Sequence, residues 1–412
     1  MTQRRLAAVD AQNLWMSAKI PNDQFLLYGF GAAPAGVLDG LRDRARRCAA
    51  LTVRVRDAGA WHYPVWEDCP VDDEQFVVHD ADDWAAVSAA VVRLADHQVD
   101  ATVHPWRLHL FPAVAAMPGV GAGSVAVLQV SHALADGARS ADLAAWLFGR
   151  GADAGPPVLS GRARGFVPRS VRAGVAHRRL VADTDAGLVP PQSRSCPVLR
   201  SNTAPSGELS VRTVLRHRAQ LPGPTVTAGV LAAVSEALAG QLRELGEDPS
   251  LLGAEVPMAK AGPRMAHNHF GNVGVGLYPA LAPHARAHAI AVDLSRRRRR
   301  VAHPAMAAED AAFAAMPAAL LRWGTSAFDP TVRSETVIGN TVVSSVNRGA
   351  ADLSLGGTPV AFTTGFPALS PMMGVTHGVH GIGDIVAVSV HAAASAIGDV
   401  DAYLDRLAHA LG

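Results

Sequence analysis

The segment QVSHALADGARSADL, residues 129–143, is the part of the sequence that constrains the fold most. It starts at the end of the apolar run VAVLQV, which is typical of a buried strand, and continues into GARSADLAAWLFG, whose apolar spacing predicts a helix closed by Gly149. His132 and Asp136 fall in the short connection between these elements. We therefore expect His132 at the end of a strand, in a loop held by the following helix.

An imidazole in such a loop is suited to acid–base chemistry. Its unperturbed pKa of about 6.5 lets it accept a proton from an attacking hydroxyl, amine or thiol near neutral pH. Asp136 would fix the loop that aims the ring, and it could equally be the N-cap of the helix. Gly137 would let the backbone turn sharply without a side chain filling the site.

The spacing HxxxD alone carries little weight, because a chain with 17 histidines produces it by chance about once. The same spacing occurs at residues 79–83 and 380–384. A glycine follows only in the pair His132 and Asp136, which is therefore the candidate that we retain.

Other candidate sites are weaker. His284 and His288 have i,i+4 spacing but lack a third ligand, and His267 and His269 are expected at the surface or in a loop, so no metal site is predicted. The basic run at residues 296–300 is typical of a solvated helix face, with a phosphate-attracting patch as the alternative.

Composition excludes several classes of protein. A formal net charge of +1 argues against nucleic acid as a partner. The three cysteines are scattered, which fits a reducing cytosol, and the N-terminal segment lacks the apolar stretch of a secretion signal. We therefore expect a cytoplasmic protein.

A chain of 412 residues is too long for one typical core, so we expect two lobes. Residues 1–150 would form the first lobe with the HxxxDG motif, residues 151–206 a crossover or linker, and residues 207–412 the second lobe. Strand-like and helix-like segments mix without strict alternation, which predicts the α+β class. Expected elements include a strand at 209–218, helices at 226–242 and 400–411, the latter capped by Asp399, and an alanine-rich helical region around residues 307–323.

Beyond the motif, weaker matches in a fixed order resemble the wax ester synthase / diacylglycerol acyltransferase (WS/DGAT) family. That family belongs to the superfamily of chloramphenicol acetyltransferase and the nonribosomal peptide condensation domains. The matching segments are AAVDAQNLWM (7–16), YPVWEDCPVDDEQFVVHD (63–80), HPWRLHLF (104–111), PTVTAGVLAAVSEAL (224–238), AEVPMA (254–259), FGNVGVGLYP (270–279), VVSSVNRG (342–349) and GGTPVAF (356–362).

The resemblance implies two chloramphenicol acetyltransferase-like lobes that meet at a tunnel with His132 in its middle. Acyl-CoA would enter from one side and the acceptor from the other, and His132 would deprotonate the acceptor for direct attack on the thioester. Asp136 would keep the loop in shape beside Gly137. No metal or prosthetic group is implied, because the acyl-CoA or acyl-carrier thioester is a co-substrate.

The chain departs from the family pattern at two places. Ser131 replaces the first of two adjacent histidines and becomes a candidate substrate-binding residue, while the family's Asn-Asp pair falls on Thr227 and Ala228. These changes keep the base but leave the acceptor open: a long-chain alcohol, a diacylglycerol or a specialised biosynthetic intermediate.

Three further residues are candidates outside the motif. Asn272 and Asn347 lie in glycine-bearing segments, and their amides could border the tunnel and donate to a developing oxyanion, although such asparagines more often serve turns. Arg212, on an expected strand, could pair with Asp136 across the lobes or lie at the surface.

Three functions remain open at this point. The leading one is an acyltransferase that moves an acyl group from acyl-CoA to a hydroxyl acceptor and forms an ester. The second is a condensation-type enzyme that takes the acyl group from an acyl or peptidyl carrier protein and forms an amide or ester in natural-product biosynthesis. The third is a non-catalytic binding or scaffold protein. Contact with a membrane or lipid surface is left open.

Overall fold

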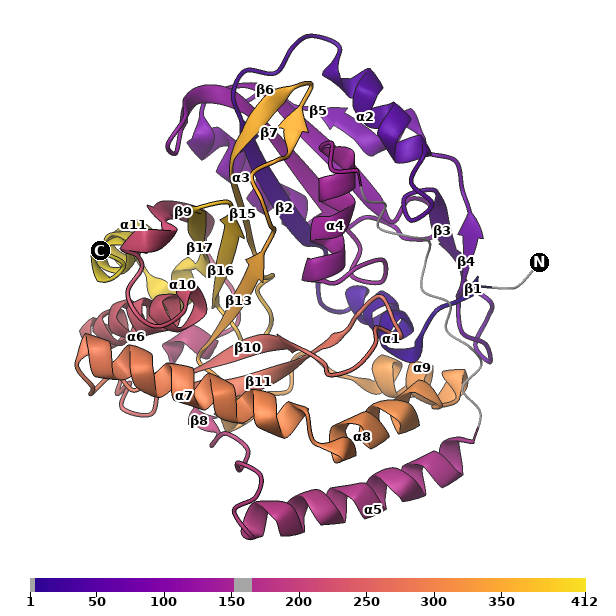
Figure 1. Ribbon diagram of the computed structural model, residues 1–412, viewed down its shortest axis with the longest axis vertical. Helices are drawn as coiled ribbons and strands as arrows, with labels where there is room; N and C mark the ends of the chain where they lie inside the picture. The colour runs from indigo at the N-terminus through magenta and orange to yellow at the C-terminus, as the bar shows by residue number, and fades with distance from the viewer. Residues whose placement is uncertain (1–3, 152–164) are drawn as a thin grey trace.

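The computed structural model describes residues 4–151 and 165–412. In this part of the chain the strands form two six-stranded sheets and two smaller ones. Figure 1 shows one large sheet in the indigo and purple half of the molecule and the other in the orange and yellow half, with helices packed around both. The expected α+β architecture with two lobes is confirmed.

The first-lobe sheet is built on the long antiparallel hairpin that leads into the motif. Its buried strands pack alternate apolar side chains against the helices beside them. The strand order is β14 (Ser354–Leu355), β15 (Thr358–Phe366), β2 (Gln24–Phe30), β7 (Gly121–Val130), β6 (Trp106–Met117) and β5 (Phe76–Val78). The motif follows β7 directly.

The second-lobe sheet mixes parallel and antiparallel neighbours. Its order is β11 (Phe270–Gly276), β10 (Gly253–Ala259), β13 (Thr341–Asn347), β16 (Val375–Ile382), β17 (Ile385–Ala393) and β9 (Leu209–His217). Strands β10, β13 and β16 run parallel, so their carboxyl ends meet at one edge. That edge lies beside the motif, as described below.

The helices and the two small sheets complete the lobes. The helices are α1 (Ala8–Ser17), α2 (Val37–Arg46), α3 (Trp84–Ala95), α4 (Gly137–Leu147), α5 (Phe166–Asp185), α6 (Val226–Glu244), α7 (Pro283–Val301), α8 (Pro304–Ala314), α9 (Ala318–Ala327), α10 (Ala394–Ile397) and α11 (Val400–Ala410). The small sheets pair β4 (Val65–Asp68) with β1 (Arg4–Arg5) and β3 (Val53–Arg56), and β12 (Thr336–Val337) with β8 (Cys196–Pro197).

Most expected elements are confirmed. The predicted helices at 226–242 and 400–411 are α6 and α11, and the side chain of Asp399 caps α11. The helical region expected around residues 307–323 is confirmed, and it consists of two helices, α8 and α9, separated at residues 315–317. The break falls before Pro317, because the residue before a proline is disfavoured in helical conformation.

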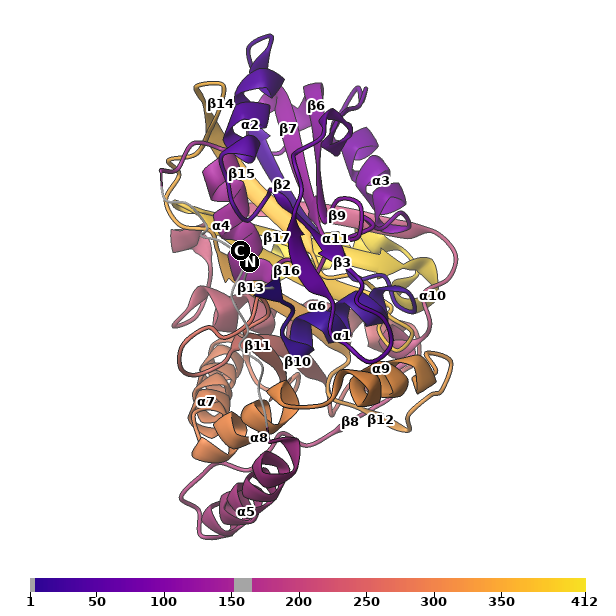
Figure 2. The same cartoon turned by 90° about the vertical axis from the view of Figure 1, so that its right-hand side faces the viewer.

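The second half of the chain contributes a strand to the first-lobe sheet. Strand β15 comes from the second half of the chain yet pairs along β2 in the first-lobe sheet, from Phe30 opposite Val360 to Phe25 opposite Phe366. In Figure 1 the orange β15 lies beside the indigo β2, and Figure 2 shows the same arrangement from the side. The proposed lobe boundaries at residues 150 and 206 stay predictions. Strand β15 belongs to the first-lobe sheet although its residues follow both boundaries in the sequence.

Three clusters of buried apolar side chains hold the fold together. One fills the first lobe and one fills the second. The third joins them, because it combines Phe25 and Leu27 of β2, Val87 of α3, Val211 of β9 and Phe362 of β15. Burial of apolar surface at this seam fixes the position of the motif relative to the second lobe.

Candidate active site

The motif occupies the turn between β7 and α4. The amide of Ser131 donates to the carbonyl oxygen of Pro105 at 2.9 Å, and the amide of Leu134 donates back to Ser131 at 2.9 Å, which ends the strand in a tight turn. Asp136 then begins α4: its side chain accepts a hydrogen bond from the amide of Arg139 at 3.0 Å. Both ends of the loop that carries His132 are therefore fixed.

Asp136 is buried and ionised. The guanidinium of Arg264 donates to its two oxygens at 2.9 and 3.3 Å, and the amides of Arg139 and His269 donate at 3.0 and 2.9 Å. Burial by itself would raise the pKa of Asp136, but these hydrogen bonds and the charge of Arg264 hold the pKa below its usual value. The carboxylate therefore keeps its charge at neutral pH and holds the loop in shape.

Arg264 comes from the connection between β10 and β11, residues 260–269, which reaches from the second lobe to the first. The buried carboxylate of Asp10 in α1 accepts the amides of His267 and Asn268 at 3.0 and 2.9 Å, and the Asn268 side chain at 2.9 Å. The same Asn268 amide group donates to the carbonyl oxygen of His132 at 2.7 Å. The connection from the second lobe therefore holds the turn that carries His132 in place.

The ring of His132 is partly buried beside the ring of Phe270, with the ring centroids 5.7 Å apart. Its Nδ1 is enclosed without a hydrogen-bond partner among the described residues. Burial lowers the pKa of His132 from its ordinary value, opposed by its own carbonyl group, by Asp136 and by Asn268. The imidazole is therefore neutral at pH 7, and because Nδ1 is enclosed, Nε2 is the candidate proton acceptor.

Ser131 and Gly137 have different surroundings from those expected. Ser131 is buried, and its hydroxyl accepts the amide of Ala133 at 3.4 Å, so it supports the turn; substrate binding by Ser131 stays a prediction. Gly137 has an ordinary helical conformation, so the sharp turn expected there is wrong. A Cβ at Gly137 would lie 3.4 Å from Val346, an ordinary contact, so the motif lies against the end of β13 without requiring glycine at this position.

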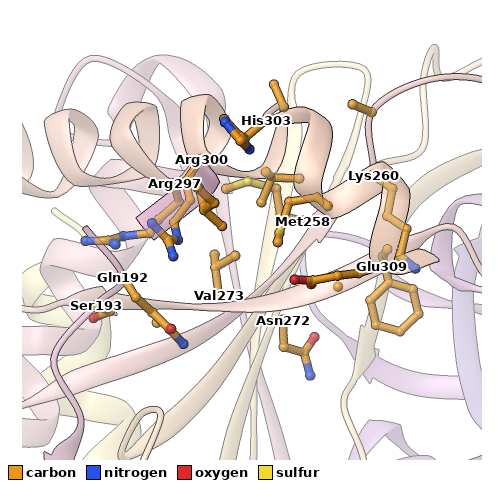
Figure 3. Close-up of a pocket in the computed structure, with 18 of the residues that line it drawn as sticks. Gln192, Ser193, Met258, Lys260, Asn272, Val273, Arg297, Arg300, His303 and Glu309 are labelled. Atoms are coloured by element: carbon orange, nitrogen blue, oxygen red, sulfur yellow. The ribbon is translucent and has the colours of Figure 1, made fainter. Parts of the chain in front are cut away.

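A cavity of about 520 Å³ adjoins the motif through Phe270, which lines it as well as contacting His132. Figure 3 shows Met258, Val273 and Asn272 of β10 and β11 along one side. Asn272 lines this cavity, and its side-chain nitrogen donates to Glu255; a role for Asn272 in substrate binding stays a prediction.

Three of the basic side chains that line this cavity lie beside carboxylates. Lys260 lies 2.6 Å from Asp310 in α8, and Arg297 of α7 lies 2.6 Å from Asp293. His303 lies 3.1 Å from a further carboxylate, that of residue 183. The basic run at 296–300 is thus not only a solvated helix face, because Arg297 is buried in this ion pair.

A second cavity, of about 490 Å³, adjoins the motif through Val346 and opens beside the start of α6. Asn347 lines it, and its side-chain oxygen accepts the amide of Gly349 at 3.1 Å, so it also serves a turn. The hydroxyls of Thr227 and Ser345 lie 2.9 Å apart in the same wall. Asn272 and Asn347 therefore border two different cavities.

The proposed partnership of Arg212 with Asp136 is wrong. Arg212 lies on β9 as expected, but its guanidinium pairs with the exposed Asp401 of α11 at 2.5 Å. Arg264 takes the place beside Asp136. An arginine at position 264 has no periodic signal in the sequence, because it lies in an irregular connection, and only the neighbouring HNHF segment drew attention to this region.

Among the described residues, no group of three or more histidine, cysteine, aspartate or glutamate side chains is arranged to hold a metal ion. His284 and His288 lie on α7, and His267 and His269 lie in the β10–β11 connection. None of the helices in the described ranges combines the length and apolar character needed to cross a membrane.

Comparisons with solved structures place this geometry in a known fold. Wax ester synthase/diacylglycerol acyltransferase from Marinobacter aquaeolei VT8 superposes with a TM-score of 0.64 at 18% identity, covering 99% of this chain and 98% of that one. The chain has the two-lobed fold of these acyltransferases. No model of a protein family matches the sequence, and no curated protein does.

Two other neighbours share the fold. The starter condensation domain of rhizomide synthetase, in complex with C8-CoA and Leu-SNAC, gives a TM-score of 0.60 at 13% identity over 100% of this chain and 93% of that one. Trichothecene 15-O-acetyltransferase from Fusarium sporotrichioides gives 0.60 at 12% identity over 99% and 95%. At these identities the likeness concerns the fold.

Proposed function

We propose that the protein is an acyltransferase that moves an acyl group from a thioester, acyl-CoA in the leading form, to the hydroxyl of a small acceptor. The observation that carries the proposal is the neutral imidazole of His132 in a loop fixed at both ends, with two cavities that are lined by neighbours of the motif, Phe270 beside the ring and Val346 beside Gly137. The two cavities would be the approaches of the donor and the acceptor, which together form the tunnel.

The reaction needs only one proton-transferring side chain. Nε2 of His132 takes the proton of the acceptor hydroxyl while the oxygen attacks the thioester carbonyl carbon, which gives a tetrahedral intermediate. The C–S bond then breaks, the leaving thiolate takes the proton back from His132, and an ester and a free thiol are released. Asp136 keeps its negative charge throughout and favours the transient imidazolium.

The developing oxyanion needs a hydrogen-bond donor, and Asn347 suits this role better than Asn272. The side-chain nitrogen of Asn272 already donates to Glu255, whereas Asn347 uses its oxygen for Gly349 and keeps its N–H groups without a partner in the described part of the chain. An amide donor at the oxyanion typically contributes about 10²–10³ in rate.

The decisive experiment measures thiol release from a panel of acyl-CoA chain lengths with mixed alcohols and amines. Wild type is compared with His132→Ala and with a matched control, His284→Ala, which removes an exposed histidine of α7. We expect release that requires an acceptor, falls about 10²–10⁴-fold in His132→Ala and is unchanged in the control. Equal turnover in wild type and His132→Ala would contradict the proposal.

A condensation-type reaction is the second candidate, supported by full-length similarity of fold to a starter condensation domain. The same assay with acyl groups on a carrier protein separates the two, because a carrier-dependent enzyme would be silent with every acyl-CoA and active with the acyl-carrier thioester. If both donors fail while all variants are folded, the protein is a non-catalytic binder, and ligand affinity would then be the same in wild type and His132→Ala.

A further inference from the structure

The cavity of about 520 Å³ beside Phe270 follows the edge strand of the second-lobe sheet, and we call it the β11 cavity. Its lining includes every residue of β11 from Phe270 to Gly274. At about 3.4 Å per residue, these positions span roughly 14 Å. Phe270 contacts the ring of His132, so the cavity has one end at the motif and one end away from it.

The end away from the motif is formed by α7 and by the chain around Ser193. A Cβ on Gly274 would lie 2.9 Å from the side chain of Ser193, so this segment covers the far end of the cavity. Arg300 of α7 donates to a carbonyl oxygen just before Ser193 at 3.0 Å, and Arg194 follows Ser193 in the chain. Figure 3 shows Arg300 and Ser193 at one end of the cavity and Lys260 at the other.

Positive charge is in excess along the β11 cavity. The lining contains more cationic side chains than carboxylates: Arg194, Lys260, Arg297 and Arg300 against Glu309 and Asp310. Lys260 and Arg297 lie beside carboxylates, whereas Arg194 and Arg300 form no ion pair within the described ranges. Two such guanidinium groups favour an anion at the far end, and a phosphate suits them because its oxygens accept several hydrogen bonds.

The long side of the cavity offers backbone hydrogen-bonding groups, because β11 is an edge strand. The amide of Gly276 points away from β10 and donates to Asp293 of α7 at 3.0 Å. In an antiparallel pair, residues bonded to the partner strand alternate with residues that point outwards, so the amides of Gly274 and Asn272 also point away from β10. No described residue accepts a hydrogen bond from these two amides.

A phosphopantetheine arm matches these features in order. It carries a thioester at one end, two amide groups along its length and a phosphate at the other end, and it is roughly as long as four residues of extended chain. An edge strand bonds the amides of an extended ligand as it would bond an added strand. With the phosphate at the basic end, the thioester would lie near Phe270, beside His132.

Given the proposed acyl transfer, on which this assignment rests, we propose that the β11 cavity is the donor channel. The arm lies along β11 and bonds to its outward amides, and the phosphate is bound by Arg194 and Arg300. The arm and its phosphate are common to acyl-CoA and to an acyl-carrier thioester, so the assignment holds for either donor. The acceptor then reaches His132 through the other cavity, the one beside Val346.

The test is titration calorimetry with two probes that differ only in the phosphate, 4′-phosphopantetheine and pantetheine. We expect wild type to bind the phosphate-bearing probe roughly ten-fold more tightly, as hydrogen bonds between charged groups allow. Arg194→Gln and Arg300→Gln should each reduce this preference roughly three-fold or more. Absence of binding by 4′-phosphopantetheine, or an undiminished preference in both variants, would overturn the proposal.

These two variants differ in how much they disturb the fold. Arg194 is exposed, whereas Arg300 is half-buried and bonded to its neighbours. If Arg300→Gln does not fold, Arg194→Gln decides alone, because an undiminished preference in that variant also overturns the proposal.

A variant in the other cavity decides between the two approaches. Arg218 lines the cavity beside Val346, and its guanidinium donates to the carbonyl oxygen of Gly383 at 2.9 Å. Arg218→Gln should keep the preference for the phosphate-bearing probe. If Arg218→Gln removes the preference and Arg194→Gln does not, the donor enters through the other cavity and the assignment is wrong.

The position of the arm along β11 is tested at Asn272. Asn272→Pro removes one outward amide and Asn272→Ala removes only the side chain, and an edge strand tolerates proline. We expect Asn272→Pro to bind both probes roughly three- to ten-fold more weakly than Asn272→Ala does, with the phosphate preference retained. Equal affinities in the two variants would show that the arm does not lie along β11.

Thiol release separates a failure of the donor channel from a failure of the proposed function. Turnover that requires His132, with a donor KM that does not rise in Arg194→Gln, would overturn the donor channel alone. A retained phosphate preference without any turnover that depends on His132 would overturn the acyl transfer and leave the phosphopantetheine site in place. The donor that is turned over, acyl-CoA or acyl-carrier, identifies the source of the arm.

Discussion

His132 balances two opposing influences on its imidazole. Burial lowers its pKa and keeps the ring neutral, while the negative charge of Asp136 acts in the opposite direction and favours the imidazolium that forms during the reaction. Arg264 forms an ion pair with Asp136, which keeps the carboxylate ionised. Because this ion pair also offsets the negative charge, Asp136 does not keep His132 protonated. A base that is free at pH 7 and accepts a proton only transiently follows from this arrangement.

The pH dependence of the rate should report this balance. His132 must be neutral to act, so kcat/KM should fall as the pH drops through its pKa, and burial places that limb below pH 6.5. Initial rates between pH 4.5 and 8, with pH-jump controls for unfolding, measure the limb. A midpoint at or above pH 6.5 would contradict the assignment of His132 as a buried base.

Arg264 is expected to act as a positioning residue. Arg264→Ala leaves Asp136 buried without its cation, so we expect kcat to fall about 10- to 100-fold with little change in KM, and stability to fall by about 1–3 kcal/mol. Arg264→Lys should restore part of both. Steady-state kinetics and urea unfolding measure these effects.

The matched control is Arg212→Ala, which removes an arginine of the same lobe that pairs with the exposed Asp401. Exposed ion pairs contribute little, so this variant should lie within about 1 kcal/mol of wild type and keep its activity. An equal loss of kcat in Arg212→Ala and Arg264→Ala would show that the pairing with Asp136 is not what matters.

At the scale of elements, the connection between β10 and β11 links the lobes at the motif. Residues 260–269 bring Arg264 to Asp136 and Asn268 to the carbonyl of His132, and Asp10 anchors them from α1. A connection held at both ends can position the catalytic loop although it has no regular structure itself.

Asp10 gives this anchor a pH dependence. Burial raises the pKa of Asp10 to about 6, so between pH 4 and pH 6 the folded protein holds a proton that the unfolded chain releases. Its contribution to stability therefore falls as the pH rises through this window. Relative to Asp10→Asn, which cannot titrate, wild type should lose on the order of 2–3 kcal/mol between pH 4 and 6 in urea unfolding. A constant difference would argue against a buried, titrating Asp10.

The sequence predicted elements better than it predicted contacts between them. Helix α6 and strand β9 are defined by local periodicity, and the loop of His132 by the strand and helix beside it. The break between α8 and α9 was missed because alanine-rich segments keep an apolar pattern through a turn. The hydrogen bonds from Arg264 to Asp136 and from Asn268 to His132 could not be predicted from local patterns, because they join residues more than 125 positions apart.

At the scale of the molecule, the first lobe depends on β15, a strand from the second half of the chain. Strands β14 and β15 form one edge of the first-lobe sheet, and Phe362 is wholly buried in the cluster that joins the lobes. A ring atom of Phe362 lies where a Cβ on Gly29 of β2 would be, so the backbone of β2 is shaped to receive this strand. The first-lobe sheet is therefore not complete within the first half of the sequence.

This dependence predicts the behaviour of the separate halves. A fragment of residues 1–151 lacks β14 and β15, so β2 would become an unpaired edge with exposed apolar side chains such as Phe25 and Leu27, which favours aggregation. We expect it to be insoluble or aggregated alone and to form a soluble 1:1 complex when co-expressed with residues 165–412. Size-exclusion chromatography and circular dichroism measure both states. A folded, monomeric fragment of residues 1–151 would show that β15 is dispensable and that the first lobe folds independently.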